Sequence, residues 1–174
     1  GAGLGFLNGE ATIDKVETLL TEATANGAKL GGFPESFIPC FPVWCLVHAP
    51  SDQHPLFTRL YENALDVKSD AFRKLTSLAK KYNAFLSIGV TEKSDYSMGA
   101  MWNTNLLFDS NGNLVGQHRK IMPTWASKQV HNFGDGSSQI VQETDIGKMG
   151  VMICGENNNT LARHSKVDQG DKLH

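Results

Sequence analysis

Three side chains of this 174-residue sequence have the chemical types needed for covalent catalysis. Cys154 follows the apolar run 148–153, and Gly155, Glu156 and three asparagines come directly after it. This change predicts a strand that turns sharply into a helix, with the thiol exposed at the corner. Backbone N–H groups at such a helix start, beginning with that of Gly155, can bind a developing oxyanion. A buried core cysteine is the alternative that this stretch alone leaves open.

Glu35 and Lys120 are the two other groups, and each ends a strand-like run. A thiol is mostly protonated near neutral pH, so a general base such as Glu35 is needed to remove its proton. The ammonium of Lys120 would favour the thiolate and stabilise the anion that forms on attack. Taken singly, Glu35 could be only a strand end, and Lys120 could belong to a solvated basic pair with Arg119.

The order Glu35, Lys120, Cys154 resembles the catalytic triad of the nitrilase superfamily, the carbon–nitrogen hydrolases. Three motifs carry the resemblance along almost the whole chain. The first is Phe33-Pro34-Glu35-Ser36-Phe37-Ile38-Pro39 together with Trp44, and the second is His118-Arg119-Lys120 together with Pro123-Thr124 and Gly134-Asp135-Gly136. The third is Cys154-Gly155-Glu156-Asn157 together with Leu161-Ala162-Arg163. The sequence of the last motif resembles that of the nitrile-hydrolysing branch of the family. Because the triad and the motifs agree, we favour a catalytic role for the three residues over their separate structural explanations.

The resemblance implies a hydrolase that converts a nitrile to the carboxylic acid and ammonia. The sulfur of Cys154 would attack the nitrile carbon to give a thioimidate, and addition of water, loss of ammonia and hydrolysis of a thioester would follow. Such chemistry requires no metal or organic cofactor. Two other functions stay open, namely a cyanide hydratase or aliphatic amidase that uses the same triad, and a catalytically weak or silent nitrilase-like protein kept for assembly or binding.

Four more side chains are candidates for the substrate pocket. Phe41 and Trp44 lie in the Pro- and aromatic-rich loop 39–45, where plain packing is an equal alternative to a pocket wall. The resemblance adds Glu156 and Asn157, which follow the nucleophile. We predict no metal site, because the two cysteines of the loop have no second ligand pair at suitable spacing.

The chain departs from the family pattern at Ser127. The family usually places a second glutamate a few residues after the lysine motif, where its carboxylate helps to position the substrate and the triad. A serine supplies neither that charge nor that reach, so we expect reduced activity or a different substrate range, with Ser127 as a further pocket candidate. Gly155 replaces the commoner tryptophan and is expected to open the pocket, and His131 stands where an aromatic residue is frequent.

The composition fits an ordinary globular domain, with 40% hydrophobic and 20% charged residues. A formal net charge of -2 gives no electrostatic case for nucleic acid or an anionic membrane as a partner. The three cysteines do not suggest a disulfide framework, and no signal peptide or membrane span is recognisable. We therefore expect a cytoplasmic protein that acts on a small nitrile or amide, and the resemblance implies a homo-oligomer, either a dimer or a spiral.

Strands and helices must position these side chains, and the hydrophobic periodicity predicts both. We expect helices near 13–25, 54–65 and 69–82 and after 157, and strands at 28–33, 84–90, 102–109, 114–119, 138–142 and 148–153. Strands mixed with helices indicate the α/β class, and the resemblance sharpens this to a four-layer α-β-β-α sandwich. We expect residues 1–174 to form one domain that lacks the family's first strand and its C-terminal part, as a piece of a longer protein would.

Overall fold

The computed structural model describes residues 6–174. The start of the chain, where we expect the family's first strand to be missing, falls partly outside these residues. The α helices are α1 (Gly9–Ala25), α2 (His54–Asn63), α3 (Asp70–Tyr82) and α4 (Thr160–Asp168). The strands are β1 (Leu30–Ile38), β2 (Phe85–Lys93), β3 (Met101–Phe108), β4 (Leu114–Arg119), β5 (Gln142–Thr144) and β6 (Gly147–Met149). Short 3₁₀ helices are η1 (Val43–Leu46), η2 (Pro50–Asp52), η3 (Trp125–Gln129) and η4 (Cys154–Asn158).

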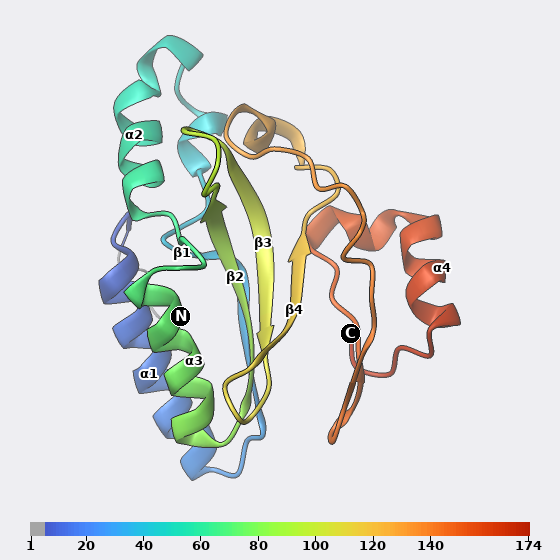
Figure 1. The fold of residues 1–174 in the computed structure, drawn as a ribbon. Helices are drawn as coiled ribbons and strands as arrows, with labels where there is room; N and C mark the ends of the chain where they lie inside the picture. The colour runs from blue at the N-terminus through green and yellow to red at the C-terminus, as the bar shows by residue number, and fades with distance from the viewer. Residues whose placement is uncertain (1–5) are drawn as a thin grey trace.

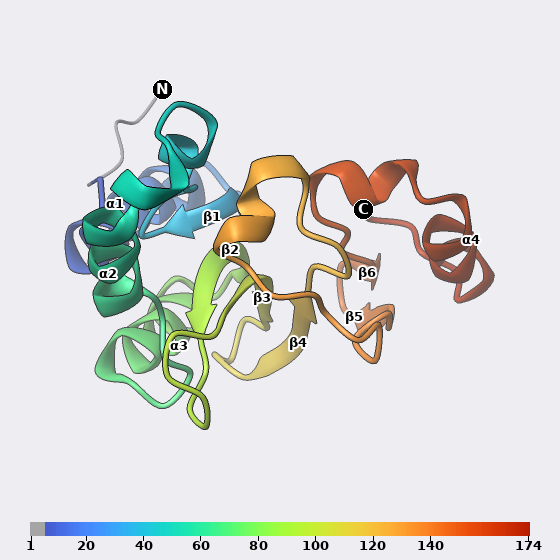
Figure 2. The ribbon, with the colours of Figure 1, turned by 90° about the horizontal axis from the view of Figure 1, so that it is seen from above.

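Strands β1 to β4 form one sheet in the order β1-β2-β3-β4 (Figures 1 and 2). β2 runs parallel to β1, and the connection between them carries α2 and α3. β3 is antiparallel to both β2 and β4. The turn at Asn111-Gly112 joins β3 to β4, and Gly112 has φ +86°, as the Asn-Gly pair predicts. β2 and β3 are the inner strands, and every residue of β3 is buried.

Helices α1 and α3 cover one face of this sheet (Figure 1). α3 begins and ends at residues suited to those places, because Ser69 Oγ accepts a hydrogen bond from the N–H of Phe72 and Asn83 adopts a left-handed φ of +47°. The core between helices and sheet consists of buried apolar side chains from both layers, among them Ile13, Val16, Leu20, Leu75, Leu78, Leu86, Ile88, Leu106 and Phe108.

The β5–β6 hairpin covers part of the opposite face, and α4 lies beyond the hairpin (Figures 1 and 2). Met149 of β6 packs with Phe85 and Leu107 of the main sheet in a small cluster between the two layers. The layers therefore follow one another as helix, sheet, sheet and helix. This order agrees with the α/β sandwich that the sequence predicts.

The predicted strand at 138–142 is wrong for most of its length, because β5 begins only at Gln142. A side chain at the end of α4 takes the place of a strand neighbour before that point. Gln169 donates from Nε2 to the Gln139 carbonyl oxygen at 2.9 Å, and its Oε1 accepts from the N–H of Val141 at 2.9 Å. The backbone here is satisfied without a ladder, so no strand forms.

The predicted strand at 148–153 is shorter in the structure, since β6 ends at Met149. Beyond that point the backbone pairs only through an isolated bridge between Met149 and Leu173. The N–H of Gly150 is shared between the Leu173 carbonyl oxygen at 2.9 Å and Asp171 Oδ1 at 2.8 Å. The approach to the cysteine is therefore irregular rather than extended.

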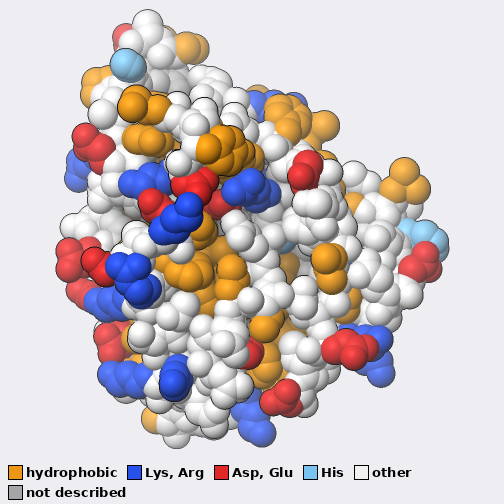
Figure 3. Space-filling view, in the orientation of Figure 1, with side chains coloured by type: hydrophobic (Ala, Val, Ile, Leu, Met, Phe, Trp, Pro, Cys, Tyr) orange, Lys and Arg blue, Asp and Glu red, His pale blue; other side chains and the backbone are white. Residues whose placement is uncertain are grey.

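Charged side chains gather over the helix layer, whereas the strands beside it show mainly uncharged side chains on the same side of the molecule (Figure 3). Ion pairs of Lys74 with Asp14 at 2.5 Å and of Lys81 with Glu17 at 2.7 Å link α3 to α1. Solvent screens such exposed pairs, so the apolar core contributes more to holding the layers together. Among residues 6–174, no helix combines the length and the apolar character needed to cross a membrane.

Candidate active site

The carboxyl end of β1 leaves its register with β2 between Phe33 and Ile38, and this bulge carries Glu35. The two strands approach each other closely there, because a Cβ atom built on Gly89 of β2 would lie 2.3 Å from the Pro34 carbonyl oxygen. Such an approach of one backbone to another requires glycine. Glu35 is thereby placed in a cleft on the sheet face away from α1 and α3.

One carboxylate oxygen of Glu35 accepts hydrogen bonds from both Lys120 and Asn103. Lys120 donates from Nζ to Glu35 Oε1 at 2.6 Å, and Asn103 donates from Nδ2 to that atom at 2.5 Å. Lys120 is 1% exposed, and its backbone N–H donates to the Asn103 carbonyl oxygen at 2.8 Å. Charge-assisted bonds of this kind fix the orientation of a carboxylate. None of the described residues donates to Oε2 of Glu35, which is therefore available to accept a proton.

Cys154 shares a cleft of about 400 Å³ with Glu35. The open face of β1, β2 and β3 forms one wall, and residues 149–154 form another. Cys154 is exposed and has φ +53°, a left-handed conformation that residues with a side chain rarely adopt. Such strain persists only where the surroundings hold it, and it clusters at functional sites. The predicted nucleophile and base thus open into one cavity, and Lys120 is bonded to the base.

No residue in the described part of the chain accepts a hydrogen bond from the backbone N–H of Gly155. Gly155 does not line the cleft, and a Cβ atom at this position would lie 3.2 Å from Thr124 Oγ1. The wider pocket expected from this glycine stays a prediction.

Glu156 and Asn157 are not in the cleft that we expected them to line. The Glu156 carboxylate points into the protein and is 6% exposed. Burial raises the pKa of this carboxyl, but hydrogen bonds from His118 and from two backbone N–H groups outweigh burial and hold the pKa below its ordinary value. Asn157 donates from Nδ2 to the Cys154 carbonyl oxygen at 3.0 Å. Both side chains support the backbone around the cysteine and do not face the cavity.

The other predicted pocket residues also lie outside this cleft. Trp44 is 3% exposed and belongs to a core cluster beneath α2, together with Leu60. Phe41 is half-buried in the same loop. Ser127 is 2% exposed, and its hydroxyl donates to the Thr124 carbonyl oxygen at 2.7 Å within η3. In the structure Trp44 packs in the core, and Ser127 supports the backbone of η3.

Two polar residues near Glu35 were not predicted as site residues. Asn103 lies in an apolar strand, and the polar residue Asn105 on the same face of β3 was the signal that could have revealed it. His131 is 2% exposed, and Nε2 lies 3.3 Å from Thr91 Oγ1. Burial lowers the pKa of His131 to about 4, with smaller opposing contributions from Glu35 and Lys120, so the imidazole is neutral at pH 7.

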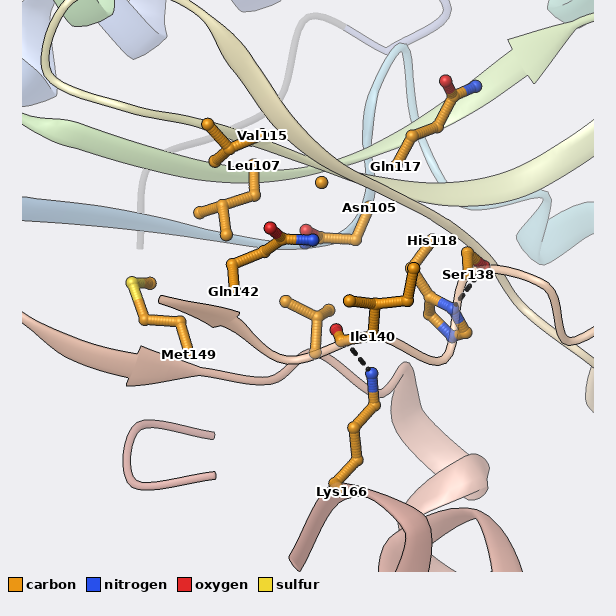
Figure 4. A pocket seen from close by; sticks show the side chains of 12 residues that line it. Asn105, Leu107, Val115, Gln117, His118, Ser138, Ile140, Gln142, Met149 and Lys166 are labelled. Atoms are coloured by element: carbon orange, nitrogen blue, oxygen red, sulfur yellow. Dashed lines mark hydrogen bonds between the residues drawn. The ribbon is translucent and has the colours of Figure 1, made fainter. Parts of the chain in front are cut away.

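A second cavity of about 190 Å³ lies between β4 and the β5–β6 hairpin (Figure 4). Lys166 reaches its edge from α4 and donates to the Ile140 carbonyl oxygen at 3.0 Å, and burial lowers the pKa of this ammonium. Neither Glu35 nor Cys154 lines this cavity. Within residues 6–174, no group of three or more His, Cys, Asp or Glu side chains is arranged to hold a metal ion.

Comparison with known proteins identifies the family. A family model described as carbon–nitrogen hydrolase matches residues 6–174. The chain belongs to the carbon–nitrogen hydrolase family. A carbon–nitrogen hydrolase from Helicobacter pylori G27 has the same fold as this carbon–nitrogen hydrolase, with a TM-score of 0.73 and 21% identity over 94% of this chain and 53% of the other. A mutant amidase from Nesterenkonia sp. AN1 gives a TM-score of 0.72 at 14% identity over 97% of this chain and 61% of the amidase. The predicted nitrilase-type α/β fold is confirmed.

Curated relatives of this carbon–nitrogen hydrolase are nitrilases. A nitrilase of Bacillus sp. (strain OxB-1) is 38% identical over 169 residues, which cover 97% of this chain and 49% of that protein. A bifunctional nitrilase/nitrile hydratase of Nicotiana tabacum is 36% identical over 174 residues, with the same shares of 97% and 49%. The chain therefore spans about half the length of the curated relatives that it matches.

Proposed function

We propose that this carbon–nitrogen hydrolase converts a nitrile to the carboxylic acid and ammonia through a covalent bond to Cys154. The observation that carries the proposal is the shared cleft of Cys154 and Glu35, with Lys120 bonded to Glu35 at 2.6 Å. Relatives named as nitrilases support the nitrile as substrate class. The amidase from Nesterenkonia sp. AN1, in which acrylamide has added to the active-site cysteine, supports the cysteine as the reacting group.

Each group would have one task in the reaction. Glu35 Oε2 takes the thiol proton, and the sulfur of Cys154 bonds to the nitrile carbon while nitrogen gains a proton, which gives a thioimidate. Lys120 and the N–H of Gly155 stabilise the negative charge that develops on nitrogen and later on oxygen. Addition of one water and loss of ammonia leave a thioester, and a second water releases the acid and restores the thiol.

Intact mass spectrometry tests the covalent step. The full-length protein is incubated with a panel of aliphatic and aromatic nitriles and analysed under denaturing conditions. We expect a mass increment equal to the nitrile, with ammonia and acid in solution, and no increment in the Cys154→Ala variant. An unmodified wild-type protein that releases no ammonia from any nitrile would contradict the proposal.

The nitrile hydratase reaction is the second candidate, because the relative from Nicotiana tabacum is named for both activities. After one water adds to the thioimidate, the C–S bond would then break instead of the C–N bond, which releases the amide, restores the thiol and forms no ammonia. Chromatography of the products separates the two outcomes, since a nitrilase yields acid and a hydratase yields amide. Cytoplasmic location and a homo-oligomeric assembly stay predictions.

A catalytically silent protein is the contrasting possibility, and Ser127 is the residue that distinguishes it. Replacing Ser127 by glutamate restores the carboxylate that the family usually has at this position. A gain of about tenfold or more in turnover, the effect expected of a group that positions substrate, would identify a weakened enzyme. Because Ser127 is buried, the variant must first be shown to fold by circular dichroism. A folded variant as inactive as an inactive wild type would favour an assembly or binding protein.

A further inference from the structure

The carboxylate of Glu156 joins the chain segments that carry the nucleophile and the lysine. Its Oε2 accepts a hydrogen bond at 2.7 Å from the N–H of Ile153, the residue before Cys154. Its Oε1 accepts at 2.6 Å from the N–H of Ile121, the residue after Lys120. One buried side chain therefore spans the two segments, with a separate oxygen for each.

His118 holds this carboxylate from a third side. Its Nε2 lies 2.8 Å from Glu156 Oε2, and its Nδ1 lies 3.0 Å from Ser138 Oγ (Figure 4). His118 is the residue two positions before Lys120 in the β4 strand, so it ties the same strand to the carboxylate. Buried groups of this kind are held rigidly only when every partner is present.

The backbone at Cys154 needs such support. A non-glycine residue at φ +53° is strained, at a cost of about 1–3 kcal/mol that the surroundings must offset. Glu156 fixes the residue before the cysteine, and Asn157 fixes the carbonyl oxygen of the cysteine itself. Displacement of a reacting group by about 1 Å lowers a rate about 100-fold.

We propose that Glu156 is a positioning residue that sets the separation of the Cys154 thiol from the Lys120 ammonium. It holds the backbone immediately beside each of these residues and touches neither the cleft nor a substrate. The expected effect on turnover rests on the proposed nitrilase function. The expected effect on the thiol does not.

The test is Glu156→Gln in the full-length protein. The amide has no charge, and its NH₂ group faces the backbone N–H of either Ile153 or Ile121, so that N–H loses its acceptor. The matched control is Glu92→Gln. Glu92 is 1% exposed and accepts hydrogen bonds from Thr104 and Gln117, together with an ion pair to Arg119, on the helix-covered face of the same sheet. Both variants disturb a buried, multiply bonded carboxylate, but only one of these carboxylates joins the segments of the site.

We expect kcat for nitrile hydrolysis to fall about 100-fold in Glu156→Gln, with KM changed less than about threefold, because binding is untouched and alignment is lost. Glu92→Gln should keep kcat within about threefold at a temperature where both variants are folded. If Glu156→Gln does not fold, Glu156→Asp replaces it, because an aspartate keeps the charge but is one methylene too short to reach both N–H groups. Equal losses of kcat in the Glu156 and Glu92 variants would overturn the proposal.

Alkylation of Cys154 by iodoacetamide at fixed pH separates this inference from the proposed function. Cys40 and Cys45 are buried, so peptide mapping can isolate the rate at the exposed cysteine. We expect the rate to change at least about fivefold in Glu156→Gln and to stay within about twofold in Glu92→Gln, since the environment of the thiol changes only in the first. A wild type without nitrile turnover but with this difference would refute the nitrilase and keep the positioning role. Equal alkylation rates in all three proteins would refute the positioning role.

Discussion

Replacing Gly89 by alanine is expected to displace the bulge that presents Glu35. The added Cβ atom would lie 2.3 Å from the Pro34 carbonyl oxygen, 2.7 Å from Glu35 Cα and 2.8 Å from the backbone nitrogen of Ser36. To reach even 3.0 Å, the backbone of β1 must withdraw from β2 by about 0.7 Å. Because all three neighbours are backbone atoms, no side-chain rotation relieves the contact.

Overpacking of this kind costs about 1–3 kcal/mol of folding free energy. For a chain of this length that corresponds to a fall of about 2–12 °C in Tm. The rate should suffer more than the stability, because the backbone that moves is that of Glu35 itself. A shift of this size at a reacting group predicts a loss of about 100-fold in kcat.

Circular dichroism during heating measures the Tm, and ammonia release from a nitrile measures the rate. Gly32→Ala in β1 is the matched control for stability, because its Cβ atom would meet nothing within 4 Å. We expect that variant to keep its Tm or to gain up to about 1 kcal/mol of stability from a stiffer unfolded chain. A Gly89→Ala protein with the Tm and kcat of the wild type would refute the role assigned to this glycine.

Three further substitutions probe the groups around Glu35. Asn103→Leu removes one donor from Glu35 Oε1, so kcat should fall about tenfold, as expected for a hydrogen bond to a charged group. The substitution also removes the unpartnered Oδ1 of Asn103, so urea unfolding should show a loss of folding free energy that is smaller than the loss of transition-state stabilisation. Gly134→Ala places a Cβ atom 2.3 Å from the Arg119 carbonyl oxygen and 2.9 Å from that of Lys120, and heating should reveal a lowered Tm. His131 has a folded-state pKa of about 4 against an ordinary value of 6.5, so the unfolded chain binds the proton first as pH falls. The contribution of neutral His131 to the free energy of unfolding is therefore fully present above pH 6.5 and declines toward pH 4, by about 2 kcal/mol at pH 5. Urea titrations at pH 7 and pH 5 should show this decline in the wild type and not in His131→Phe.

Local sequence patterns predict the elements that place the base and the lysine. The helical spacing of Leu75 and Leu78, with Ser69 and Asn83 at the ends, predicts α3 almost to the residue. The Asn-Gly pair at Asn111 predicts the β3–β4 hairpin that delivers Lys120. These signals lie within a few residues of the structure that they determine, which is why they can be read without the fold.

Contacts between distant residues account for what the sequence does not reveal. Val141 has the neighbours of a strand residue, but the side chain of Gln169 satisfies its backbone and no ladder forms. Glu156 follows the nucleophile as a pocket residue would, yet its partners in the β4 region turn it inward. Trp44 suits a pocket wall or a core equally well by its chemistry, and only the position of α2 decides for the core.

The base and the lysine belong to one layer of the sandwich, and the nucleophile belongs to the other. Glu35 lies in the bulge of β1 and Lys120 directly follows β4 of the four-stranded sheet, whereas Cys154 follows the β5–β6 hairpin on the opposite side of the cleft. Within residues 6–174 no strand ladder links the two halves of the site, so we expect side chains such as Glu156 to set the gap between them. From the proposed function, we expect the reaction rate to depend on the spacing between these two layers. Moderate pressure acts on the voids between packed layers. It should therefore lower the rate of nitrile hydrolysis at pressures below those that unfold the helices.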